Sequence, residues 1–188
     1  RLIRRAAVQG WNLGLRQPGA YFMLGLLLKD DNTDRSQRYL QQSVKHPDFA
    51  LGSHLVTAQI YEKNQQWSEA ASAYVQSLAL ADAQLVPPDQ VEELLSQYDA
   101  LTDTVNSDDT ASLQSVCNSA SSQLNRPDWR TYLAKVREHI PPQPEGSPPS
   151  PVFEMVFEAR SSQVVEAMAM VRSLAGNGML RSALEEAL

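Results

Sequence analysis

Small and aromatic side chains follow one another at fixed intervals in residues 51–84. With Leu51 counted as position 1, small residues occupy positions 8, 20 and 27 and aromatic residues occupy positions 11, 17 and 24; in chain order these are Ala58, Tyr61, Trp67, Ala70, Tyr74 and Ser77. Small side chains allow two helices to approach closely, and aromatic side chains fill the space between neighbouring pairs. The spacing therefore predicts a hairpin of two closely packed antiparallel helices.

The rest of the chain also has the pattern of helices. Ala, Leu, Gln and Glu dominate, and no stretch alternates apolar and polar residues for long enough to indicate a strand. Polar or proline-containing breaks, such as residues 30–34 and 125–128, separate segments with apolar residues at helical spacing. We predict an all-α fold in which antiparallel helix pairs are stacked.

The pattern in residues 51–84 resembles the tetratricopeptide repeat (TPR), a 34-residue helical hairpin. This segment departs from the TPR pattern at His54, Thr57 and Asp82. Residues 18–50 fit the same frame more weakly, with Gly25 at position 8, and residues 164–188 fit it a third time as a truncated repeat. The resemblance implies a right-handed superhelix whose concave face binds a protein or peptide partner.

The TPR resemblance also indicates which side chains line the concave face, because that face is formed by positions 2, 5, 9, 12 and 13 of each first helix. The candidate protein-binding residues are Phe22, Leu26, Lys29, Leu55, Gln59, Glu62 and Lys63. The carboxylate clamp of some TPR proteins needs Lys and Asn at positions 5 and 9, where this chain has Phe22 and Leu26. The alternative is that a helix at residues 4–15, or the C-terminal helices, covers these two apolar residues.

A proline-rich tract marks the clearest boundary in the chain. Six of the 11 prolines lie in residues 141–151, and proline fixes φ and removes a backbone donor. We predict five parts: an N-terminal packing helix (1–17), two TPR-like repeats (18–84), atypical helices (85–140), a Pro-rich linker (141–151) and a C-terminal helical hairpin (152–188). The start without Met and the end within a helical pattern suggest a piece of a longer protein.

The composition argues against several classes of function. The formal charge is −6 and the pI is near 5.0, whereas nucleic-acid binding needs a basic surface. One cysteine, Cys117, and three scattered histidines give no metal-ligand spacing, and no catalytic motif or cofactor loop is present. Cys117 is interpreted as a structural thiol. No apolar run is long enough to span a membrane, and the composition suits a bacterial cytoplasm.

These patterns favour a non-enzymatic scaffold or adaptor that mediates protein–protein interaction through its helical concave surface. The alternative is a regulatory or sensory module of a larger multidomain enzyme or signalling protein. The last segment, Met179 to Leu188, carries one apolar stripe at spacings of three and four residues. That stripe predicts packing against residues 164–174 and possible homo-oligomerisation through the C-terminal helix.

Overall fold

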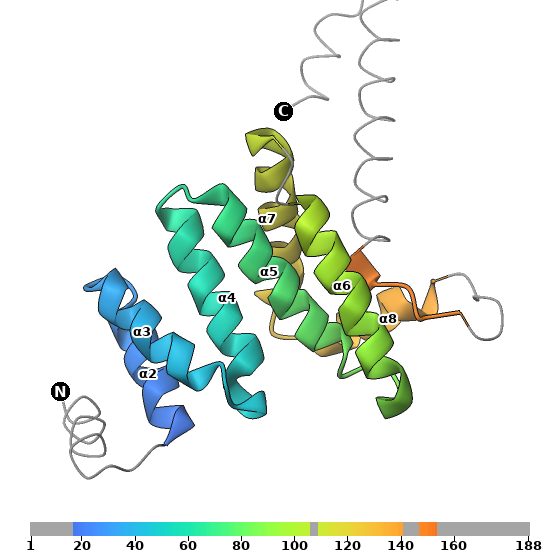
Figure 1. The fold of residues 1–188 in the computed structure, drawn as a ribbon, viewed down its shortest axis with the longest axis horizontal. Helices are drawn as coiled ribbons and strands as arrows, with labels where there is room; N and C mark the ends of the chain where they lie inside the picture. Colours follow the sequence, from blue (N-terminus) through green and yellow to red (C-terminus); the bar gives the residue numbers. More distant parts are fainter. Residues whose placement is uncertain (1–16, 106–108, 141–146, 154–188) are drawn as a thin grey trace, which may run out of the picture.

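The computed structural model describes residues 17–105, 109–140 and 147–153, and within these ranges every regular element is a helix (Figure 1). The helices are α2 (Pro18–Leu28), α3 (Thr33–Ser43), α4 (Pro47–Lys63), α5 (Trp67–Asp82), the 3-10 helix η1 (Pro88–Gln90), α6 (Val91–Val105), α7 (Thr110–Leu124) and α8 (Trp129–Glu138). The prediction of an all-α fold is confirmed. The predicted N-terminal packing helix before Gln17 and the C-terminal hairpin beyond Phe153 lie outside the described residues.

Local chemistry explains where several helices begin. Prolines at 18 and 47 occupy the first turn of α2 and α4, where a missing backbone N–H is tolerated. Asp109 caps α7 by accepting hydrogen bonds from the amides of Ala111 and Ser112, at 2.8 and 3.0 Å. The cap of α3 is Asn32, whose side chain accepts a hydrogen bond from the Arg35 amide at 3.1 Å.

The turn between α4 and α5 is closed by backbone hydrogen bonds. The Gln66 amide donates to the Tyr61 carbonyl at 2.9 Å, and the Gln65 amide donates to the Glu62 carbonyl at 3.0 Å. These two bonds form the Schellman motif, which requires a left-handed residue directly after the helix cap. Gln65 takes that conformation, with φ of 59°. The chain therefore reverses within three residues and sets α5 antiparallel to α4.

Small residues allow the helices of each pair to approach. Ala58 on α4 and Ala70 and Ser77 on α5 are all fully buried, as their positions in the predicted hairpin require. In the first pair, Gly25 on α2 faces Leu40 on α3, and a Cβ at Gly25 would lie only 2.6 Å from the Leu40 side chain. The Ser36 hydroxyl also donates to the Gly25 carbonyl at 2.6 Å.

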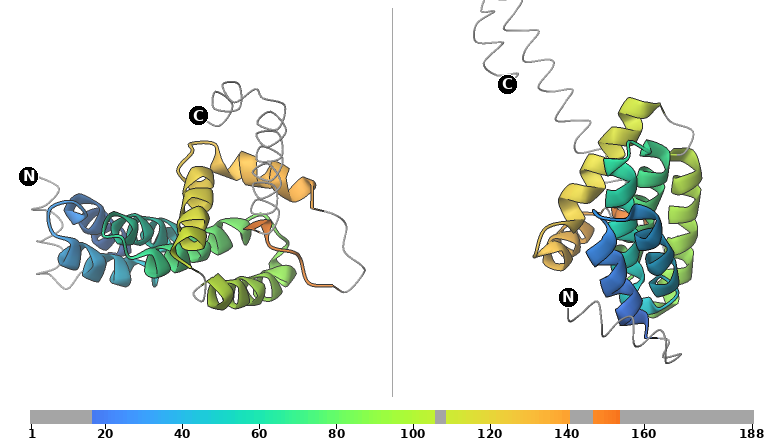
Figure 2. Two further views of the ribbon diagram at one scale, coloured as in Figure 1. Left: turned by 90° about the horizontal axis from the view of Figure 1, so that it is seen from above. Right: turned by 90° about the vertical axis from the view of Figure 1, so that its left-hand side faces the viewer.

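Helix α5 lies at the centre of the fold. Ten of its 16 residues are buried, and it packs against α4, α6 and α7. Figure 2 shows α6 on one side of α5, with α7 and α8 on the other. The large core extends from Ala58 to Phe153, whereas a smaller one, made of Leu40, Val56 and Ile60 with Phe22 packed against it, joins the first helix pair to α4. None of the described helices is long and apolar enough to cross a membrane.

Candidate functional site

Two of the three apolar candidates, Phe22 and Leu55, pack largely between helices. The Phe22 ring lies 5.8 Å from the Phe49 ring, centroid to centroid, and it covers Gly52 of α4. Leu55 is half-buried and packs against the large core. These residues therefore join α2 to α4 and α4 to the core, and their remaining exposed surface is limited.

Three polar candidates on α4 are hydrogen-bonded within the chain. Gln59 donates to the Asn125 side chain at the end of α7 at 3.0 Å, and Glu62 accepts from the Tyr74 hydroxyl at 2.5 Å. The Lys63 ammonium lies 2.8 Å from an Asp30 carboxylate oxygen, and its hydrogen bond lowers the pKa of Asp30. A ligand on this part of the predicted face would have to displace or share these contacts.

The exposed apolar side chains gather on α2. Among the described residues, the large hydrophobic side chains that are most exposed are Met23, Leu26 and Leu27, at 39%, 36% and 40%. Their spacing of three and four residues places them on one face of the helix. Lys29, half-buried, follows at the C-cap of α2. We call Met23, Leu26 and Leu27 the α2 patch, and Leu26 is the predicted site residue that it contains.

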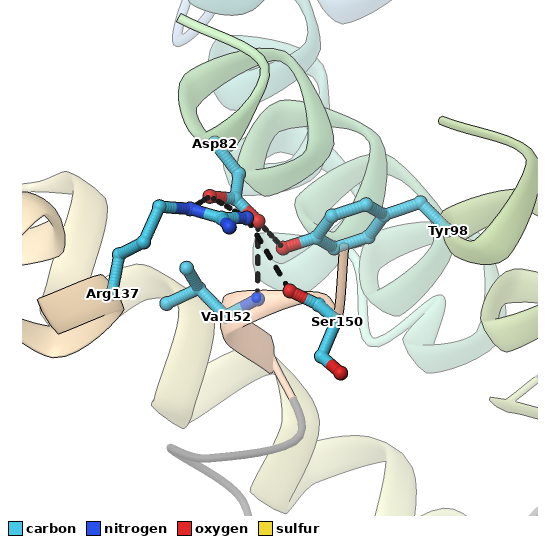
Figure 3. Close-up of polar contacts among 5 residues, drawn as sticks. All are labelled: Asp82, Tyr98, Arg137, Ser150 and Val152. Carbon is cyan, nitrogen blue, oxygen red and sulfur yellow. Dashed lines mark hydrogen bonds and ion pairs between the residues drawn. The ribbon is translucent and has the colours of Figure 1, made fainter. Parts of the chain in front are cut away.

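A buried carboxylate joins elements that are distant in sequence. Asp82, at the end of α5, is fully buried; its Oδ1 lies 2.9 Å from Nε and 2.8 Å from Nη2 of Arg137 on α8. Its Oδ2 accepts from the Tyr98 hydroxyl of α6 at 2.9 Å and from the Val152 amide at 3.0 Å (Figure 3). We call Asp82, Tyr98, Arg137 and Val152 the Asp82 node.

The Asp82 node fastens the end of the proline-rich tract to the helical body. Arg137 also donates to the Ser150 carbonyl at 3.3 Å, and Pro151, Val152 and Phe153 are buried. Residues 147–150 have no regular secondary structure, as expected for a proline-rich segment, but the predicted linker boundary at Pro151 falls inside the core. Sequence reasoning missed this anchoring; the one available signal was Asp82 itself, which departs from the TPR pattern.

The Asp82 node is a structural arrangement rather than a reactive one. All four donors point at one carboxylate, so the buried charge is both paired and hydrogen-bonded. Burial and the negative charge of Asp82 raise the pKa of Tyr98, which keeps this hydroxyl a donor. Both oxygens of the Asp82 carboxylate are engaged by these donors, Oδ1 by Arg137 and Oδ2 by Tyr98 and Val152.

The thiol of Cys117 lies in an environment that suppresses its reactivity. Cys117 is fully buried on α7, and its sulfur lies 3.9 Å from the Trp67 carbonyl. Burial, followed by the nearby Glu62 charge, raises its pKa to about 12. Because the thiolate is the nucleophile, this position does not support covalent catalysis. The interpretation of Cys117 as a structural thiol agrees with these surroundings.

A shallow groove crosses α4 and α5 near His54. Two adjoining depressions share His54 and Gln76; one extends towards Val44 on the α3 side, and the other towards Leu95 on α6. Burial lowers the pKa of His54, which favours the neutral imidazole. Within the described residues, no three His, Cys, Asp or Glu side chains are arranged to hold a metal ion.

Comparison with known proteins adds no family to these observations. No protein-family model matches the chain, and no curated protein or solved structure is significantly similar to it.

Proposed function

We propose that this chain is a non-enzymatic scaffold or adaptor of TPR-like design that binds a protein partner through its helical surface. The single observation that carries the proposal is the α2 patch. In a stack of helix pairs, each pair buries an apolar face against the next, yet Met23, Leu26 and Leu27 remain exposed at the edge of the first described pair. A helix face of this kind is recognised by another apolar helix face.

The packing of the helix pairs supports the TPR-like part of the proposal. The small residues predicted at positions 8, 20 and 27 of residues 51–84 are fully buried, and Gly25 lies at position 8 of the preceding pair, close to Leu40. Helix α4 packs against both α2 and α3, which is the contact expected when one hairpin stacks on another. A right-handed superhelix would continue this stacking.

Photo-crosslinking in the intact protein tests the binding proposal. A benzophenone amino acid at Leu27 should form a crosslink to a partner protein in cells, and Leu26→Asp should abolish that crosslink. The same probe at Ser96, an exposed residue of α6, is the control position and should give no such product. Crosslinks from Leu27 only to the chain's own residues would instead show that the α2 patch is covered internally, and the proposal would be wrong.

An overpacking substitution tests the helical frame. Ala70→Leu should destabilise the fold by about 1–3 kcal/mol, because a fully buried position between α4 and α5 has no space for a larger side chain. Ala111→Leu, at an exposed position of α7, adds the same atoms without this clash and should leave the free energy of unfolding nearly unchanged. Equal urea midpoints for the two variants would contradict the frame.

A further inference from the structure

Three cationic side chains form a row along α3. Arg35, Arg38 and Lys45, together with Gln42, are separated by three, four and three residues, so they lie on one face of the helix and its C-terminal end. All three cations are exposed. A chain with a formal charge of −6 therefore concentrates positive charge on one side of its first described helix pair.

This row lines a groove that contains polar and aromatic groups but no carboxylate among the described lining residues. The groove is bounded by Pro18, Tyr21, Arg35, Arg38, Tyr39, Gln41, Gln42 and Lys45. The Tyr21 and Tyr39 rings stack across α2 and α3, with centroids 6.3 Å apart and an interplanar angle of 23°. The groove therefore offers a cationic row beside an aromatic pair.

The cations of this groove are not neutralised by ion pairs within the described part of the chain. Lys45 Nζ has an amide oxygen of Gln42 as its neighbour, at 3.4 Å. Asp34 precedes Arg35 in the chain but does not line the groove, and no described carboxylate lies within ion-pair distance of Arg35, Arg38 or Lys45. The positive charge of these three side chains is therefore available to a ligand in the groove.

We propose that this groove binds an extended acidic peptide segment of a partner protein. The row from Arg35 to Lys45 spans roughly 15 Å at the rise of a helix. About five residues of an extended peptide cover the same length, and alternate side chains of such a peptide share one face. A peptide with acidic residues at alternate positions would therefore present its carboxylates to the two guanidinium groups and the ammonium group, and Arg can bind each carboxylate through two N–H groups.

The charge distribution favours a peptide over a nucleic acid or a membrane. A nucleic-acid surface needs a basic stripe that follows a long phosphate backbone, and an anionic membrane attracts a broad basic face; here three cations lie in one groove of an acidic chain. The groove is also separate from the α2 patch, so this inference does not depend on the function proposed for that patch.

Fluorescence anisotropy with the intact protein tests the inference. The probe is a labelled peptide of about seven residues that alternates glutamate and alanine, and its control has glutamine in place of glutamate. We expect saturable binding of the glutamate peptide, weakened by raising the salt concentration, and no binding of the glutamine peptide. Arg35→Gln/Arg38→Gln should weaken binding roughly tenfold or more, whereas Lys135→Gln, which removes an exposed cation of α8, should not change it.

Two results would overturn the inference. The first is equal affinity of the wild type and Arg35→Gln/Arg38→Gln for the glutamate peptide, with circular dichroism showing that the variant is folded. The second is a competition experiment in which single-stranded RNA or anionic lipid vesicles displace the labelled glutamate peptide at a lower concentration of negative charge than the unlabelled glutamate peptide requires. That result would assign the groove to a different class of partner. A failed crosslink at Leu27 would leave both measurements unaffected.

Discussion

Removal of the Asp82 carboxylate should be among the most destabilising single changes in this chain. The carboxylate is fully buried and the Arg137 side chain is only 18% exposed. When one partner of a buried ion pair is removed, the remaining charge is left uncompensated, and the loss is about 3–5 kcal/mol. Asp82→Ala also leaves the Tyr98 hydroxyl and the Val152 amide without their acceptor. Each of these donors that is not hydrated in the variant lowers stability by a further amount of about 1–3 kcal/mol.

Three comparisons make this prediction specific. Tyr98→Phe removes one neutral donor while Asp82 keeps its others, so the expected loss is only about 1 kcal/mol. Arg137→Met should destabilise the fold almost as much as Asp82→Ala, because it leaves the buried Asp82 carboxylate without its cationic partner. The double variant Asp82→Ala/Arg137→Met should lose much less than the sum of the two single variants, since neither charge remains buried alone. Asp103→Ala, at an exposed position of α6, should change stability by less than about 0.5 kcal/mol.

Urea unfolding followed by circular dichroism at pH 7 measures these differences as shifts in the midpoint at constant m-value. Hydrogen exchange of the Val152 amide gives a second readout, because Asp82→Ala should remove the protection of this amide even under conditions where the helices stay folded. The reasoning is refuted if Asp82→Ala costs less than about 1 kcal/mol, or if the losses of the two single variants simply add in the double variant.

Three further predictions concern other buried positions. Gly25→Ala should destabilise the fold by about 1 kcal/mol or more in urea unfolding, because overlap with the buried Leu40 side chain outweighs the gain in helix propensity; a stabilised variant would contradict this. Because burial lowers the pKa of His54 below its usual 6.5, the unfolded chain takes up the proton first, so thermal stability should fall as the pH drops below about 6.5. His54→Gln should reduce this fall, and an unchanged pH profile would count against the assignment. With a pKa of about 12, Cys117 has about one thiolate in ten thousand at pH 8, so it should react with a thiol reagent such as DTNB only after unfolding in urea, and rapid labelling of the folded protein would disprove the burial argument.

The helices could largely be predicted from the sequence because their signals are local. Helix α7, for example, begins directly after its capping residue Asp109, and Asp109 and the residues that it caps are neighbours in the chain. The burial of the small residues of α4 and α5 was predictable from their spacing for the same reason. Ala58, Ala70 and Ser77 belong to one hairpin, and the short turn of that hairpin brings them together.

The candidate site was predictable only in part. The TPR resemblance implied that Phe22, Leu26 and the α4 residues share one face, but it could not show which of them have partners. The structure pairs Gln59 with Asn125, the C-cap of α7, and Lys63 with Asp30 in the turn after α2, and it leaves Leu26 exposed. The cationic row of α3 is visible in the sequence as a spacing, yet a net charge of −6 hides it, because net charge carries no information about which face a residue occupies.

The sequence by itself determined that the chain is helical, where most of its helices begin and end, and which small residues allow pairs to approach. Apolar periodicity and helix capping depend on residues a few positions apart, so these signals do not depend on the tertiary contacts. The tertiary structure alone decided that one carboxylate at the end of α5 meets partners 16, 55 and 70 residues further along the chain. Such contacts depend on how α6, α8 and residues 150–153 pack around α5, and a buried charge is stable only when that packing brings enough donors to it.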